Sequence, residues 1–549
     1  MTTRTDNIGR ASMWLASGTI ISRVLGFVKV AVLAQTIGAA SVGINAFTLA
    51  NSLPNQLYMI IAGGVLNAVL VPQIVRATKQ GDGGLGYINK LVTLAIVVLG
   101  VTTLLTTLLA PWIVSIYAVS SVTGSSASGD AILALAIAFG YWCMPQILFY
   151  GLYTVLGEIL NARRMFGPFT WAPILNNVVA IGGLVLFTVM FGADPEGTLT
   201  AGAWDAGKIA VLAGSATLGV IAQAGILMVF WRRVGLKFRF DFQWRGVGLK
   251  AAGKASSWAF GIMIAGQLAY LVTNNVAWIA ADSGFPSVFV LNMAWLVFVL
   301  PHSIITVSIT TAHFTRMSEH AAAGDLAAVR RDFSEMARSV FLLITLIMCG
   351  IIVLAIPVSR LFANTDAQVM PMALVLVGHM VWLLFFTFIF LVQRTFYALG
   401  DTRKPFLFFV LQYGLQSILC VVVALTITDQ FIAFGISIAQ GLAMAITMPV
   451  ALMWLKRVLT VGLDGARITR SIVLFTIAGV VSSLAGYLVT RWLGGNSEGG
   501  WGNSSVLGAL VTMAIVGAVM SVIYLGMLVV MRSADLQAVL NPVMRRLRR

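Results

Sequence analysis

The sequence predicts an all-α polytopic membrane protein with about fourteen transmembrane helices, arranged as two six-helix lobes plus two C-terminal helices. Of its 549 residues, 59% are hydrophobic and only 10% are charged, whereas soluble domains carry about 25% charged residues. The apolar residues also form long runs, each sufficient for the roughly 20 residues that cross a bilayer as a helix. The short alternating segments of a membrane β-barrel do not occur.

Charged and turn residues delimit the individual helices. The runs place them at residues 8–37, 41–75, 89–118, 130–159, 167–192, 205–231, 255–281, 286–313, 338–363, 370–395, 405–427, 431–454, 470–492 and 505–531. A similar segment follows the fourth and the tenth run, at 160–168 and 397–405, which suggests two repeated halves, a common transporter plan. We therefore predict four regions: an N-lobe over 1–232, a C-lobe over 233–457, two further helices over 458–531 and a basic cytoplasmic tail over 532–549.

Lys and Arg residues predict the orientation. With the N-terminus in the cytoplasm, thirty of the 35 Lys and Arg residues fall in cytoplasmic segments, and three, Lys208, Arg360 and Arg491, fall in external ones. Cytoplasmic loops carry such an excess, and one missed span would have abolished it. We therefore predict a multi-pass membrane protein with both termini cytoplasmic. The polar N-terminus shows no pattern of a removable signal peptide.

Composition also excludes several function classes. The net charge of +16 arises at helix ends, so no nucleic-acid partner is expected. The three cysteines lie inside apolar runs and give neither a disulfide framework nor metal-ligand spacing. No nucleotide-binding or catalytic motif is present, and the loops are too short for a catalytic domain. The chain is therefore predicted to be a transporter and not an enzyme, without a cofactor or a firm metal site.

The first helix carries two basic residues inside its apolar run. Arg23 lies near the bilayer centre, where a charge costs at least about 2.5–3.5 kcal/mol, so it should face a protein interior or a water-filled cavity. Lys29 lies closer to the outer interface and could line the same cavity or snorkel to the interface. The alternative for both residues is a contact between helices or with the interface.

The second helix carries polar residues on one face, at i, i+3, i+7 and i+10. These residues are Asn45, Thr48, Ser52 and Asn55. Such a face either lines a wet cavity or supplies hydrogen bonds between helices. The sequence leaves these two interpretations open.

Further candidates lie at helix ends and in the C-terminal half. Arg163 and Arg164 end the fourth helix, where they either anchor it on the cytoplasmic side or form a basic rim for an anionic head group. Oxygen-bearing side chains that could bind a coupling cation, Na⁺ or H⁺, are Asn274, Asn275, Asp401, Gln412 and Gln416. Membrane potential is the alternative energy source, worth about 2.3 kcal/mol per charge at 100 mV.

Several ordered segments carry a family resemblance. They are Ser22–Phe27, Asn45–Phe47, Leu53–Asn55, Leu160–Pro168, Ala172–Asn177, Ala294–His302 and Phe396–Arg403. In their order and spacing they resemble the MurJ (MviN) family of lipid II flippases, with an eighth span like that of actinobacterial members. The resemblance covers nearly all fourteen spans.

The resemblance implies a fold and a cargo. The fold is that of the multidrug/oligosaccharidyl-lipid/polysaccharide (MOP) exporter superfamily, with two lobes around a cavity and spans 13–14 forming a groove for a lipid tail. Arg23 matches the family's first cavity arginine, and Lys29 occupies its next basic position. The implied function is to move lipid II, the undecaprenyl-pyrophosphate-linked peptidoglycan precursor, from the inner to the outer leaflet by alternating access. Implied partners are lipid II, membrane lipids and proteins of cell-wall synthesis. The implied location is the bacterial inner (plasma) membrane.

Two alternatives remain at this stage. The first is another exporter of the same superfamily, for drugs or polysaccharide units; a cation-drug exporter would need buried carboxylates, and no Asp or Glu lies in the middle of a run. The second is a non-transporting membrane scaffold for cell-wall synthesis, in which Arg23 is only a packing anchor. Substituting Arg23 separates a scaffold from a transporter.

Overall fold

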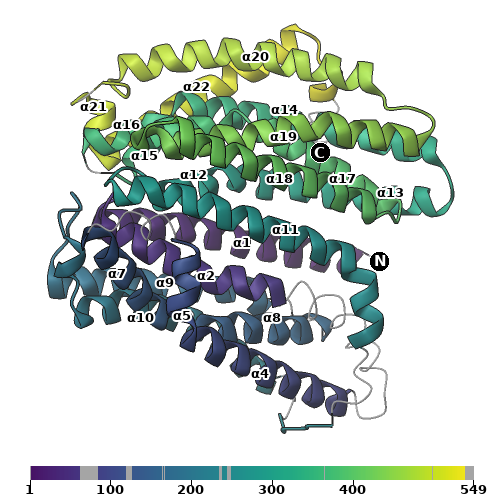
Figure 1. The fold of residues 1–549 in the computed structure, drawn as a ribbon. Coiled ribbons are helices and arrows are strands. Elements are labelled where there is room, and N and C mark those ends of the chain that lie inside the picture. Colours follow the sequence, from purple (N-terminus) through teal and green to yellow (C-terminus); the bar gives the residue numbers. More distant parts are fainter. Residues whose placement is uncertain are drawn as a thin grey trace. The chain divides into compact units, whose positions relative to one another are not determined.

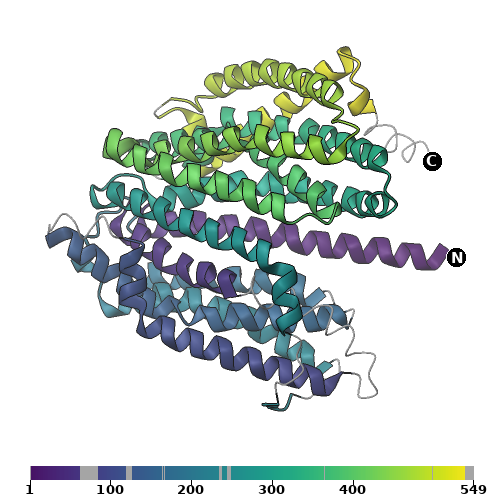
Figure 2. The ribbon, with the colours of Figure 1, turned by 45° about the vertical axis from the view of Figure 1, so that its right-hand side comes forward.

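The computed structural model describes residues 2–61, 84–118, 127–163, 165, 167–233, 238–243, 249–363, 365–497 and 499–537. Helices dominate these ranges (Figures 1 and 2). The chain forms two compact units, Met1–Phe289 and Val290–Arg549. Each unit is described by itself.

The first unit consists of long helices and two short ones. These are α1 (Thr2–Ile37), α2 (Val42–Ile61), α4 (Leu85–Leu108), α5 (Ala110–Ile116), α7 (Ala127–Cys143), α8 (Gln146–Ala162), α9 (Gly167–Phe191), η2 (Ala201–Ala203), α10 (Ala206–Arg233) and α11 (Leu249–Asp282). Helix α9 packs against both α1 and α10, and α8 packs against α4 and α10. An apolar cluster that includes Leu91, Val155 and Trp231 joins α4, α8 and α10.

Proline explains two differences from the predicted helices of this unit. The run 89–118 is divided at Leu109 into α4 and α5, with Pro111 in the first turn of α5. Proline is tolerated there because the first N–H groups of a helix have no intrahelical partner. The run 130–159 is divided at Met144 and Pro145 into α7 and α8. Both predicted runs are therefore helical but broken.

The second unit begins within α12, at Val290, and contains the remaining helices. These are α12 (Val288–Pro301), the π-helical turn η3 (His302–Thr306), α13 (Val307–Ala322), α14 (Leu326–Val353), α15 (Ala355–Arg360), α16 (Asp366–Met380), α17 (Leu383–Ala398), α18 (Arg403–Thr426), η4 (Asp429–Phe431), α19 (Ile432–Leu459), α20 (Gly465–Trp492), α21 (Trp501–Ser504) and α22 (Val506–Val530). Helix α14 packs against α13, α17 and α20, and α20 packs against α22.

The connection between α13 and α14 is shorter than the sequence predicts. We expected a link over 314–338, but α13 continues to Ala322 and α14 begins at Leu326. Gly324 makes the turn with φ of 75°, a conformation that glycine adopts without steric cost. Asp325 then caps α14, because its carboxylate accepts a hydrogen bond from the Ala328 N–H at 2.8 Å.

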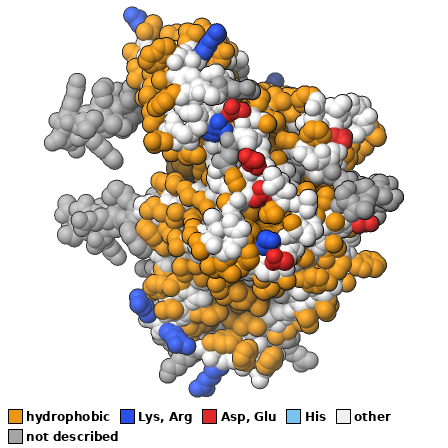
Figure 3. Space-filling view, turned by 90° about the vertical axis from the view of Figure 1, so that its left-hand side faces the viewer, with side chains coloured by type: hydrophobic (Ala, Val, Ile, Leu, Met, Phe, Trp, Pro, Cys, Tyr) orange, Lys and Arg blue, Asp and Glu red, His pale blue; other side chains and the backbone are white. Residues whose placement is uncertain are grey.

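Thirteen helical segments within the described ranges are long and apolar enough to cross a membrane. Each corresponds to a predicted span. The remaining predicted span, 41–75, begins with α2, whose apolar sequence contains several polar residues. The residues of this span after Ile61 lie outside the described part. Figure 3 shows a surface on which hydrophobic side chains predominate and charged ones are few. The protein is therefore an all-helical, multi-pass membrane protein with about 13–14 spanning helices.

The boundary between the units differs from the predicted boundary at residue 232. Helix α11, assigned from the sequence to the C-lobe, falls in the first unit, where it packs against α2 and α7. Hydrogen bonds described below explain this grouping. The lobes at 1–232 and 233–457, and the separate status of 458–531 and of the tail 532–549, stay predictions.

Candidate functional site

Arg23 lies on α1 within a segment of membrane-spanning length, Ser17–Ile37. Its side chain is half-buried. Among the described residues, none hydrogen-bonds or ion-pairs with its guanidinium group. A guanidinium has five N–H donors, and no residue in the described part of the chain uses them.

Lys29 and Arg23 occupy different faces of α1. Asn177 of α9 donates a hydrogen bond to the Ser22 carbonyl oxygen at 3.0 Å, and Gly18, one turn earlier, lets α9 approach closely. Lys29 follows Ser22 by seven residues and therefore shares this α9-facing side. Arg23 lies about 100° further around the helix, because each residue turns it by that angle. The structure therefore does not bring the two predicted cations onto one face.

Two of the polar residues on α2 contact other elements of the first unit. Asn45 is buried, and its carboxamide oxygen accepts a hydrogen bond from the Phe289 N–H at 3.0 Å. The Ser52 hydroxyl lies 2.9 Å from the Tyr270 hydroxyl of α11. These contacts favour interhelical bonding over a wet face for Asn45 and Ser52.

The other two polar residues of α2 differ. Asn55 is exposed, and the buried Thr48 hydroxyl has no hydrogen-bond partner among the residues described. One turn beyond Ser52, Gln56 accepts a hydrogen bond from Gln267 of α11 at 2.9 Å. Sequence reasoning missed Gln267 and Tyr270, although their i, i+3 spacing with Asn274 on α11 marks a polar face opposite α2.

The basic pair after α8 is only partly described. Arg163 ends α8 and is half-buried, and its N–H donates a hydrogen bond to the Ile159 carbonyl oxygen at 3.1 Å. Arg164 lies outside the described residues. A basic rim formed by this pair stays a prediction.

The asparagine pair on α11 uses its amide donors within the protein. The Asn274 side chain donates to the Tyr270 carbonyl oxygen at 2.9 Å. The Asn275 side chain donates to the Ile116 carbonyl oxygen at 2.9 Å and so connects α11 to α5. Donor bonds of this kind fix the amide orientation, while a cation would use the amide oxygens.

Asp401 lies at the start of α18 and stabilises its first turn. One carboxylate oxygen accepts the N–H groups of Arg403 and Lys404 at 3.0 and 3.1 Å, and the other pairs with the Lys404 ammonium at 2.6 Å. Partial burial acts to raise the pKa of Asp401, but the bonds from Lys404 and Arg403 outweigh it and lower this pKa below its ordinary value. The geometry favours helix capping for this carboxylate.

Gln412 and Gln416 lie one turn apart on α18, and both are buried. The Gln412 carboxamide oxygen has no hydrogen-bond partner within the described ranges. Asp401 is eleven residues before Gln412, or about 16 Å along the helix axis at 1.5 Å per residue. The structure therefore does not gather these three candidates into one cation site.

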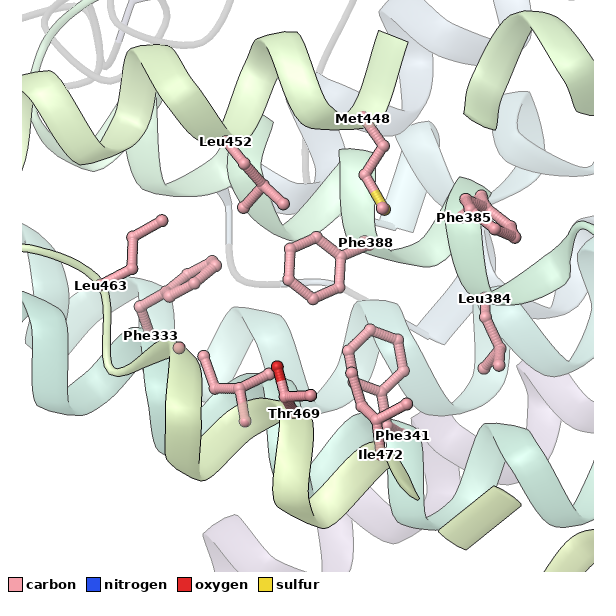
Figure 4. A pocket seen from close by; sticks show the side chains of 12 residues that line it. Phe333, Phe341, Leu384, Phe385, Phe388, Met448, Leu452, Leu463, Thr469 and Ile472 are labelled. Atoms are coloured by element: carbon pink, nitrogen blue, oxygen red, sulfur yellow. The ribbon is translucent and has the colours of Figure 1, made fainter. Parts of the chain in front are cut away.

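An apolar cavity of about 300 Å³ lies inside the second unit. Its walls come from α14, α17, α19 and α20 together with the loop before α20, and the Phe333, Phe341 and Phe388 rings point into it (Figure 4). All lining residues except Thr469 are apolar or glycine. The predicted lipid-tail groove is formed by spans 13 and 14 together. Span 13, which is α20, contributes to the wall of this cavity, but no residue of α22 does.

One cluster of His, Asp and Glu has its ligand atoms within 4.8 Å of one another: His313, Asp332 and Glu335. The guanidinium of Arg316 lies among them, with one nitrogen 3.0, 2.8 and 3.3 Å from their respective side chains. His320 contacts the second oxygen of Asp332 at 2.8 Å. Because a protein cation already balances these carboxylates, we interpret the cluster as an ionic contact between α13 and α14.

Comparison with known proteins agrees with this architecture. The sequence profile of the family described as "Lipid II flippase MurJ" matches residues 33–498. A "Probable lipid II flippase MurJ" of Borreliella burgdorferi is 24% identical over 405 residues, covering 72% of this chain and 73% of the relative. A protein of the same description from Haemophilus influenzae is 24% identical over 417 residues, covering 70% and 75%.

Solved structures share the fold. "Lipid II flippase MurJ, inward closed conformation" superposes with a TM-score of 0.70 at 17% identity, covering 94% of this chain and all of that one. An inward-facing multidrug resistance MATE family transporter of the MOP superfamily superposes with a TM-score of 0.63 at 14% identity, covering 80% of this chain and 95% of that one.

The spanning helices make the chain a polytopic membrane protein with a MurJ/MATE-like fold. The chain belongs to the lipid II flippase MurJ family, and it is therefore a transporter rather than an enzyme.

Proposed function

We propose that this chain moves lipid II from the inner to the outer leaflet of the bacterial plasma membrane by alternating access. Family membership supports the cargo, a peptidoglycan precursor with a pyrophosphate-linked head group. One structural observation carries the assignment. Arg23 is half-buried in a spanning helix and makes no hydrogen bond or ion pair with any other described residue.

Phosphate chemistry explains why an arginine is suited to this position. The planar guanidinium can donate two parallel hydrogen bonds to a phosphate group. A cation at this depth is costly unless it meets water or an anion. A pyrophosphate that enters the cavity would therefore be stabilised by Arg23, while the polyprenyl tail remains in lipid. Exposed Asn55 is a candidate donor to sugar hydroxyls, and Lys29 and Thr48 are further candidates.

The membrane orientation is part of the proposal. The distribution of Lys and Arg supports both termini in the cytoplasm, and a plasma-membrane location follows from the cargo. The segment around His302 supports an actinobacterial type of family member. Proteins of cell-wall synthesis are proposed partners, because they consume the translocated precursor.

A lipid tail and an energy source complete the proposal. Spans 13 and 14, as α20 and α22, would form a groove for the tail, and the apolar cavity beside α20 supports an acyl-binding role on this side of the second unit. Membrane potential, or a cation bound by the amide oxygens of Asn274, Asn275, Gln412 or Gln416, would drive the cycle. Arg163 and Arg164 would attract the anionic head group at the inner leaflet.

Reconstitution tests the proposal directly. Labelled lipid II is placed in proteoliposomes, and the fraction of label protected from a membrane-impermeant quencher is followed with time. Wild-type protein should exchange lipid II between leaflets, and Arg23→Ala should not. Val28→Ala, an exposed apolar position on the same helix, is the matched control and should retain exchange. Equal exchange by wild-type and Arg23→Ala would refute the role of Arg23, and absence of exchange in all three would refute the flippase assignment.

A further inference from the structure

Three phenylalanines project from the segment that follows α10 in the first unit. Phe238, Phe240 and Phe242 alternate with Arg239, Asp241 and Gln243. Their rings contact in succession, with centroids 4.9 Å apart for the first pair and 6.2 Å for the second. Ring contacts at every second residue place the three aromatic side chains on one side of the segment, which we name the Phe comb (Phe238, Phe240 and Phe242).

Hydrogen bonds fix the other side of the segment to α4. The Arg239 N–H donates to the Asn89 side chain at 3.2 Å, and the Asp241 N–H donates to the Thr93 hydroxyl at 3.0 Å. Asn89 and Thr93 are one turn apart on α4, so the segment follows this helix. Thr93 is fully buried as a result. Backbone hydrogen bonds therefore hold the Phe comb against α4.

The rings are exposed to different extents. Phe240 and Phe242 are each 63% exposed and Phe238 is 37% exposed. Three adjacent exposed phenylalanines are unfavourable in water, since removing apolar side-chain surface from water lowers the free energy. Exposed aromatic clusters of this kind mark surfaces that contact a membrane or a partner.

The Phe comb lies beside the first turns of α4, close to the end of a membrane-spanning helix. Asn89 and Thr93 lie four and eight residues after the start of α4 at Leu85, or about 6 and 12 Å along a spanning helix. This depth matches the boundary between head groups and acyl chains, where apolar faces of interfacial segments insert by roughly 5–10 Å. Further along α4, Val98 and Val101 are exposed apolar residues, as expected of a lipid-facing helix.

The charges around the Phe comb fit an anionic lipid surface. Arg232 and Arg233 form the last turn of α10, and both are exposed, as is Arg239 inside the segment. Basic residues beside a membrane are attracted to anionic leaflets. We propose that the Phe comb inserts into the bilayer interface, with Arg232, Arg233 and Arg239 on anionic head groups, and so anchors the α10–α11 connection to the membrane.

Site-specific labelling in nanodiscs tests this anchor. An environment-sensitive fluorophore is attached to full-length Phe240→Cys protein and, as matched control, to Gln243→Cys, an exposed position in the same segment. Cys349 is replaced by Ser in both, since Cys143 and Cys420 are buried. Quenching is measured with nitroxide-bearing lipids and with aqueous iodide, and unfolding temperature verifies the fold.

The expected result is strong quenching by the lipid nitroxide and protection from iodide at position 240, with the reverse preference at position 243. Replacing anionic by neutral lipids should reduce the lipid quenching at position 240. Equal iodide quenching at both positions would overturn the anchor and indicate a water-facing surface, as would iodide access at 240 in every lipid. Because nanodiscs expose both leaflets to solution, the outcome does not depend on the proposed cargo or orientation.

Discussion

A buried ion pair fastens the chain after α22 to the second unit. The guanidinium of Arg338 on α14 pairs with the Asp535 carboxylate, and the two side chains are 8% and 10% exposed. The Ser471 hydroxyl of α20 donates to the second Asp535 oxygen at 2.6 Å, and the Arg338 Nε donates to the Ser334 carbonyl oxygen at 3.2 Å. Asp535 therefore connects α14 and α20 to the segment that follows α22. The perturbation is Asp535→Ala.

The burial of the Arg338–Asp535 pair sets the expected loss in the free energy of unfolding. Removing one partner of a buried pair leaves an uncompensated charge and costs about 3–5 kcal/mol. An exposed pair contributes only about 0.2–1 kcal/mol. The Glu335 carboxylate on α14 is 55% exposed and pairs with Arg316, so Glu335→Ala is the matched control. In the double variant Asp535→Ala/Arg338→Met, much of the loss should be recovered because no unpaired charge remains.

Denaturant unfolding in mixed micelles, followed by circular dichroism, measures these free energies. Asp535→Ala should lower the free energy of unfolding by several-fold more than Glu335→Ala. A loss below about 1 kcal/mol for Asp535→Ala, the range of an exposed pair, would refute the reasoning. A double variant less stable than Asp535→Ala would refute the assignment of the loss to the unpaired arginine.

Three further substitutions test packing and capping. Gly441→Ala should cost about 1–3 kcal/mol by overpacking, because its Cβ would overlap the Trp382 indole, whereas Gly414→Ala meets no atom within 4 Å and should stabilise α18 by about 0.5–1 kcal/mol; a thermal unfolding series compares them, and equal shifts would contradict this packing. Asp401→Asn should destabilise the protein at neutral pH, because a carboxylate with a lowered pKa stabilises the fold while it is ionised. This difference in stability should begin to shrink as the pH falls below the ordinary aspartate pKa of about 3.9 and should vanish only below the lowered pKa of Asp401 in the folded protein. A pH-independent difference would contradict the capping role of Asp401.

Apolar runs predicted the spanning helices well because membrane helices must satisfy all their backbone hydrogen bonds internally. The positions at which these helices break were harder to predict from the sequence. Pro111 and Pro145 are visible in the sequence, yet proline inside a run is compatible with either a kink or a break. The helical continuation through 314–338 was missed because charged residues such as Arg316 and Arg330 predict a loop when only hydropathy is considered.

The candidate site could be predicted only in part. The insertion cost of an arginine in an apolar run was sufficient to select Arg23 as a candidate. Its functional role stays a prediction. The polar face of α2 could not be interpreted without knowing that α11 packs against it. Ser52 and its partner Tyr270 are 218 residues apart in the sequence, so no local pattern indicates their contact. Similarly, the hydrogen bonds of the Asp401 carboxylate with the first turn of α18 become visible only when the conformation of the preceding turn is known.

The central claim is that this chain transfers lipid II across the membrane and that the Arg23 cation is required. The most direct measurement determines the leaflet that holds lipid II in living bacteria depleted of this protein and supplied with wild-type or Arg23→Ala chain at equal levels. Lipid II should reach the outer leaflet with the wild-type chain and accumulate in the inner leaflet with Arg23→Ala. Normal outer-leaflet lipid II in cells that contain only the Arg23→Ala chain would contradict the account.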